Sequence, residues 1–70
     1  MSDIPSLTPK ELVKIALKKG FVLDRIKGSH HVFYHPFTKK RVVIPMHNKD
    51  LAKGILYGIL KEADIEKNDL

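Results

Sequence analysis

Length, composition and charge restrict this chain to a small protein that acts through its surface. It has 70 residues, no cysteine, no tryptophan and a net charge of +5. A chain of this size supports one domain with a core that is only just sufficient, so we expect a single domain over residues 1–70 and a shallow groove rather than an enclosed ligand cavity. The lack of cysteine excludes disulfides and thiolate metal sites and favours an intracellular, cytoplasmic protein.

The distribution of the charge indicates a polyanionic partner. Nine of the 13 Lys and Arg residues lie within residues 18–53, where the only acids are Asp24 and Asp50. Clustered cations favour nucleic acid first, because each neutralised phosphate releases counterions; an ordinary solvated surface is the alternative. The chain contains neither a signal-peptide pattern nor an apolar run near the roughly 18 residues of a membrane span, so we expect no membrane partner.

The first predicted element is a helix over residues 9–19. Thr8 and Glu11 have the spacing of a capping box, and Pro9 suits the first helical position. Apolar residues then recur on one face, and Gly20 after two lysines is typical of a left-handed helix stop.

Three short strands are predicted next. Residues 21–26 form the first, residues 27–29 a turn, residues 30–35 the second and residues 41–45 the third, with a break at 36–40. The result is an antiparallel meander. Because apolar residues occupy both parities of the second strand, the pattern does not determine which of its histidines faces the core.

A second amphipathic helix follows the strands. Its apolar residues recur at helical spacing from Leu51 to Ala63, and Asp64 is expected to cap a short helical turn that runs through Asp69. The element order predicts an α+β fold with a three-stranded antiparallel sheet, both helices on one face and the other face open.

The segment from Lys27 to Pro36, KGSHHVFYHP, contains three of the four histidines. Histidine takes and gives protons near neutral pH, and a base that deprotonates a ribose 2′-OH makes it attack the adjacent phosphate. Backbone amides and cations can receive the developing negative charge. Candidates for these contacts are Gly28, Ser29, Lys27, Lys39, Lys40 and Arg41.

Each histidine also has a plainer interpretation. His30 and His31 can be surface or partner contacts, His35 polar strand edge, and His47 a cap of the second helix or a phosphate contact. Adjacent His30 and His31 point to opposite faces of a strand, which argues against a metal site, so we expect neither metal nor cofactor. The sequence also lacks a P-loop, a dinucleotide fingerprint and a triad.

Four short motifs give the chain a family resemblance. They are Gly-Phe at 20–21, Gly-Ser-His at 28–30, Pro-Met-His at 45–47 and Lys-Gly at 53–54 ahead of an Ile-Leu-Lys helix. With these motifs the chain resembles, over residues 8–65, the HicA family of toxins, the ribonuclease partners of HicB antitoxins in type II toxin–antitoxin pairs.

The resemblance implies a double-stranded-RNA-binding-like fold and metal-independent endonuclease cleavage of mRNA, inhibited by a HicB-type antitoxin. It implies that His30 is the catalytic residue, with His31 as the alternative because some members place the histidine one position later. The remaining contacts to RNA are then expected from Lys27, Gly28, Ser29, Lys39, Lys40, Arg41 and His47. Departures at Ile55, Tyr57, Gly58 and Asp64 concern helix packing or antitoxin contact rather than chemistry.

Two alternatives to a nuclease stay open. One is a non-catalytic RNA-binding module of the same fold, although such modules usually carry a lysine cluster at the start of the last helix, where this chain offers only Lys49 and Lys53. The other is an interaction protein of a toxin–antitoxin complex whose nuclease activity has decayed.

Overall fold

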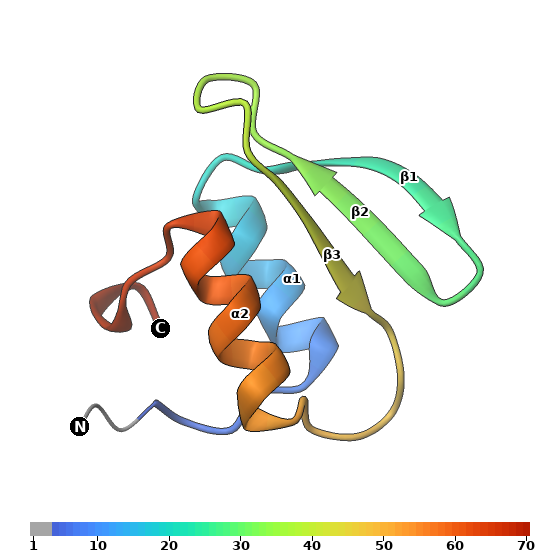
Figure 1. Ribbon diagram of the computed structural model, residues 1–70, viewed down its shortest axis with the longest axis vertical. Coiled ribbons are helices and arrows are strands. Elements are labelled where there is room, and N and C mark those ends of the chain that lie inside the picture. Colours follow the sequence, from blue (N-terminus) through green and yellow to red (C-terminus); the bar gives the residue numbers. More distant parts are fainter. Residues whose placement is uncertain (1–3) are drawn as a thin grey trace.

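The computed structural model describes residues 4–70 as two helices against a three-stranded sheet (Figure 1). The order is α1 (Pro9–Lys18), β1 (Val22–Lys27), β2 (His30–Tyr34), β3 (Arg41–Pro45), α2 (Lys53–Ala63) and the 3₁₀ turn η1 (Lys67–Asp69). The three strands are antiparallel and lie in the order β1-β2-β3. The α+β fold predicted from the sequence is therefore confirmed.

Helix α1 begins at the predicted capping box. The Glu11 backbone N–H donates to Thr8 Oγ1 at 3.2 Å, and the Thr8 N–H donates to Glu11 Oε1 at 2.9 Å. The helix ends at Lys18, one residue before the predicted end, and Gly20 takes a φ of +101° that favours glycine.

The sheet register assigns the histidines of β2 to opposite faces. Phe33, which is 2% exposed, and its β3 neighbours Val42 and Ile44 are buried beneath the helices. His31 shares this parity and pairs with Ile44, whereas His30 lies on the open face. The parity that the sequence left undetermined is thus set by the burial of Phe33.

The core lies between the helices and β3, which contacts both α1 and α2. The β1–β2 hairpin projects beyond the helices (Figure 1), so all six residues of β1 are exposed. One cluster of side chains forms the core: Ile4, Leu7, Leu12, Ala16, Phe21, Phe33, Val42, Ile44, Leu51, Leu56, Ile59, Leu60, Ala63 and Ile65.

Two expected caps differ in the structure. Asp64 takes a left-handed φ of 61° and ends α2, while the box that opens η1 is made by Glu66 and Asp69. The N-cap of α2 is Ala52 and carries no side-chain hydrogen bond, so His47 does not cap this helix. The ring of His47 instead accepts from the Lys49 N–H at Nδ1 (3.3 Å) and caps its own loop.

Candidate active site

The β1–β2 turn forms one end of the sheet, which we call the turn end (residues 27–30 with 45–47). Gly28 and Ser29 connect Lys27 to its cross-strand partner His30, and the Gly28 φ of +58° suits the first position of a type II′ hairpin turn. The Ser29 carbonyl accepts from the Met46 N–H at 2.7 Å, which fixes the turn to the segment after β3. Lys27, His30 and the segment before His47 are therefore held side by side.

His30 is exposed at this end and is available for chemistry. Its ring takes part in no hydrogen bond or ion pair with residues 4–70, the part of the chain that is described. The amides of Gly28 and Ser29 likewise donate to no described atom outside the strand ladder. Cleavage of a phosphodiester requires a base and groups that stabilise negative charge. The unbonded imidazole can act as the base, and the two free amides and the ammonium of Lys27 can stabilise the charge.

His31 has a different environment one residue along the strand. Its side chain is half-buried on the helix face, opposite Ile44 on β3 and Ile26 on β1. Its Nδ1 atom is buried and has no hydrogen-bond partner among the described residues. A base must reach its substrate proton, so this environment is less suited to the role than that of His30.

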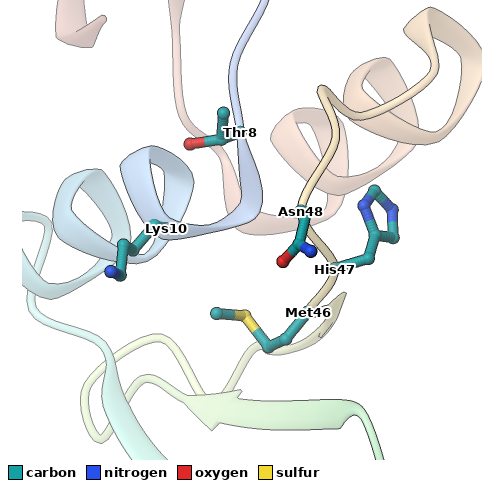
Figure 2. A pocket seen from close by; sticks show the side chains of 5 residues that line it. All are labelled: Thr8, Lys10, Met46, His47 and Asn48. Carbon is teal, nitrogen blue, oxygen red and sulfur yellow. The ribbon is translucent and has the colours of Figure 1, made fainter.

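His47 lies two residues after the end of β3, beside an open hollow of about 390 Å³. Figure 2 shows this hollow between the start of α1, with the N-cap Thr8 and Lys10 of the first turn, and the loop with Met46 and Asn48. The Met46 side chain extends toward α1, whereas the His47 ring extends to the other side of the loop. His47 therefore lies at the turn end, and its ring does not fill the hollow.

Three predicted RNA contacts lie at the opposite end of the sheet. Arg41 pairs with Tyr34 at the far ends of β3 and β2, and Lys39 and Lys40 precede it in the connecting loop. Four strand steps separate Arg41 from Pro45, the partner of His30, which is about 14 Å at roughly 3.4 Å per residue. The structure thus divides the predicted site into the turn end and a second group, which we call the loop end (residues 35–41).

Arg41 is engaged within the sheet. Its guanidinium lies 4.7 Å from the centre of the Tyr34 ring and donates to Asp24 Oδ2 at 2.7 Å, reaching across β2 to β1. The hydrogen bond from Arg41 lowers the pKa of Asp24 below its ordinary value of 3.8. A β-bulge between Leu23 and Arg25 leaves Asp24 out of register at this point. Part of the charge expected to face phosphate is thereby neutralised.

His35 has a structural role that the sequence analysis missed. Its Nδ1 accepts from the N–H groups of Phe37 and Thr38, both at 3.2 Å, so the proton lies on Nε2, which donates to the Lys19 carbonyl at 3.0 Å. The ring also packs edge-on against Phe21, with centroids 5.1 Å apart. His35 ties the β2–β3 loop to the end of α1.

Other site types find no support in the described residues. Residues 4–70 contain no group of three or more His, Cys, Asp or Glu placed to hold a metal ion. None of the helices described is long and apolar enough to cross a membrane.

Comparison with known proteins identifies the family. The model of the HicA toxin of bacterial toxin–antitoxin pairs matches residues 9–65. The chain belongs to the HicA toxin family. Among curated proteins no sequence matches it significantly. The family match covers both helices and the whole sheet, with the turn end and the loop end included.

Proposed function

We propose that this HicA-family toxin is a metal-independent endoribonuclease that cleaves mRNA at the turn end, with His30 as the proton-transfer residue. The observation that carries the proposal is the exposed His30 ring, unbonded within the described chain, opposite Lys27 and next to two free turn amides. Membership of a toxin family supports it further.

The proposed reaction needs only groups of the turn end. His30 takes the proton of a ribose 2′-OH, the oxygen attacks the adjacent phosphorus, and the P–O5′ bond breaks. The products are a 2′,3′-cyclic phosphate and a 5′-OH, with the leaving oxygen protonated by imidazolium or water. Lys27 and the Gly28 and Ser29 amides stabilise the charge on the phosphoryl oxygens. His47, from the neighbouring segment, is a further phosphate contact.

His31 remains the competing catalytic residue. Its half-buried ring favours a packing role, but its unpartnered Nδ1 is unusual, because most buried polar atoms are hydrogen-bonded. Separate His30→Ala and His31→Ala variants distinguish the two residues. Cleavage lost only in His31→Ala would move the active site to the helix face of the sheet.

A HicB-type antitoxin is the proposed inhibitor. The basic residues that bind RNA phosphates would equally bind acidic side chains of a protein that covers the turn end. Expression in a bacterial host provides the test. We expect growth arrest that a cognate antitoxin relieves; absence of arrest from a well-expressed chain would favour a toxin whose nuclease has decayed.

The biochemical test uses purified protein, single-stranded RNA and excess EDTA. We expect cleavage products that end in a 2′,3′-cyclic phosphate, and no cleavage when every 2′-OH of the strand is methylated. Cleavage that stops in EDTA, or that yields 5′-phosphates, would contradict the mechanism. The second candidate is a non-catalytic RNA-binding module, which the lysines at the loop end favour because they can bind phosphate. Salt-dependent binding of RNA without cleavage by the wild-type protein would support it.

A further inference from the structure

We infer that the loop end is a second RNA subsite, in which the ring of Phe37 stacks on an unpaired base at least about four nucleotides from the scissile phosphate. The inference rests on the proposed RNA substrate and assigns to it a contact away from the catalytic turn. It is carried by the rigidity of the loop, the exposure of Phe37 and the free charges beside it.

The loop that presents Phe37 is closed by its own hydrogen bonds. Every backbone N–H from Phe37 to Lys40 is used: two donate to the His35 ring, the Lys39 N–H donates to the His35 carbonyl at 2.8 Å, and the Lys40 N–H donates to Thr38 Oγ1 at 3.3 Å. Lys39 holds a left-handed φ of 65° at the same place. The loop is therefore ordered before any ligand binds, and only its side chains remain for recognition.

Phe37 is the most exposed large apolar side chain of the described residues, at 90%. Within residues 4–70 its ring has one aromatic neighbour, His35, with centroids 6.2 Å apart and the planes inclined at 50°. An exposed phenylalanine does not contribute the stabilisation that burial of its ring would give, and a 70-residue domain has only a small core. A face of this ring is available to a partner with a flat surface.

The positive charges around Phe37 favour a nucleic acid as that partner. Lys39 and Lys40 follow it within three residues, the loop from 35 to 40 contains no acid, and neither lysine forms an ion pair with a described residue. Aromatic side chains beside cations are the usual platform for unpaired bases, whose phosphates the cations neutralise. The loop amides are all occupied, so the lysines alone contact phosphate here.

The distance between the two ends sets the register of the strand. The roughly 14 Å along β3 from Pro45 to Arg41 corresponds to about four nucleotides of a stacked strand at roughly 3.4 Å each. A strand with its scissile phosphate at His30 then reaches Phe37 only when it extends at least that far to one side. Shorter strands cannot bridge the two ends.

A Phe37→Trp variant reports on this contact directly, because the chain contains no other tryptophan. The probe is single-stranded RNA of three to ten nucleotides with every 2′-OH methylated, so that binding is measured independently of cleavage. We expect the indole fluorescence to be quenched by strands longer than about four nucleotides, and not by an abasic strand with the same phosphates. Equal quenching by the abasic strand would overturn the inference.

Affinity measurements complete the test. Phe37→Leu is expected to raise the Kd of the ten-nucleotide strand about tenfold while leaving that of the three-nucleotide strand unchanged. Ile55→Ala is the control, because it also removes apolar atoms from an exposed residue, here on α2. It should change neither of the two Kd values. An unchanged Kd in Phe37→Leu, or loss of antitoxin binding in its place, would assign Phe37 to a protein interface instead. Cleavage by wild-type protein is scored separately, so a failed subsite and a failed nuclease are told apart.

Discussion

His30, the first residue of β2, and His35, the residue after its last, differ in their hydrogen bonding. At the turn end the ring of His30 is exposed and unbonded within the described chain, beside amides that donate to nothing described. At the loop end the ring of His35 is bonded at both nitrogens, and every amide from Phe37 to Lys40 is occupied. The polar groups of the turn end are unbonded within the described chain, whereas those of the loop end hold the shape of the loop.

Within one short segment, this difference distinguishes the proposed catalytic histidine, His30, from a structural histidine, His35. A histidine whose Nδ1 accepts two backbone N–H groups cannot take a substrate proton at that atom without breaking the loop. A histidine whose residue is exposed and whose ring is unbonded within the described chain contributes little to the stability of the fold. If this division holds, substitutions at the two ends differ in their effect on stability.

Loss of the His35 ring should have the largest effect on stability. His35→Ala removes three hydrogen bonds and the packing on Phe21, and at about 1 kcal/mol for each hydrogen bond we expect a loss of about 3 kcal/mol. Thermal unfolding followed by circular dichroism should show a Tm lower by 10 °C or more. His30→Ala is the control, with an expected change within about 0.5 kcal/mol. Equal Tm values for the two variants would contradict the view that His35 stabilises the fold and His30 does not.

Gly20→Ala tests the contact between α1 and the loop end. A Cβ at Gly20 would lie 2.8 Å from His35 Nε2, on a backbone with φ of +101°. We expect a loss of about 1–2 kcal/mol in denaturant unfolding, because both the backbone and the His35 ring must shift. Gly58→Ala is the matched control: its Cβ meets nothing within 4 Å, and a helix-interior alanine should stabilise by about 0.5–1 kcal/mol. The same sign for both variants would contradict this view.

His31→Leu should be neutral or stabilising by up to about 1 kcal/mol. The substitution removes a buried Nδ1 without a described partner and keeps an apolar contact for Ile44. Urea unfolding measures the change. A loss of more than about 1 kcal/mol would mean that the His31 ring makes a polar interaction in the folded protein, and would strengthen its claim to the active site.

The smallest effect on stability is expected from protonation of Asp24 at low pH. Because Arg41 lowers the pKa of Asp24 in the folded state, the unfolded chain binds more protons below about pH 3.8. The stabilisation is complete above that pH and is lost as the pH falls through the lowered folded value. Asp24→Asn should lower the Tm slightly at pH 7 and flatten its dependence on pH in the acid range, so that the curves of the variant and the wild type converge at low pH. An unaltered slope would show that the pair with Arg41 contributes nothing at this end.

The sequence was sufficient for the elements and insufficient for the roles of the side chains. The capping box at Thr8 and the strand over 41–45 are local signals, and both were confirmed. The role of His35 depends on Lys19, 16 residues away, and that of Arg41 on Asp24, 17 residues away across β2. Neither pairing has a local pattern.

The assignment of faces on β2 was equally out of reach. Val32 and Phe33 are both suited to a core, and only the assembled sheet shows that Phe33 and its parity are buried. A one-residue change of register would exchange the positions of His30 and His31. The sequence alone therefore leaves both His30 and His31 as candidates for the catalytic residue.

We propose that the exposed His30 performs the chemistry and contributes little to the stability of the fold. The most direct measurement is the rate of cleavage of a saturating single-stranded RNA in EDTA by wild-type protein and by His30→Ala, with the Tm of both recorded. We predict a rate reduced by about 10²- to 10⁴-fold with a Tm within about 2 °C of the wild type. A rate within threefold of the wild type would contradict the claim.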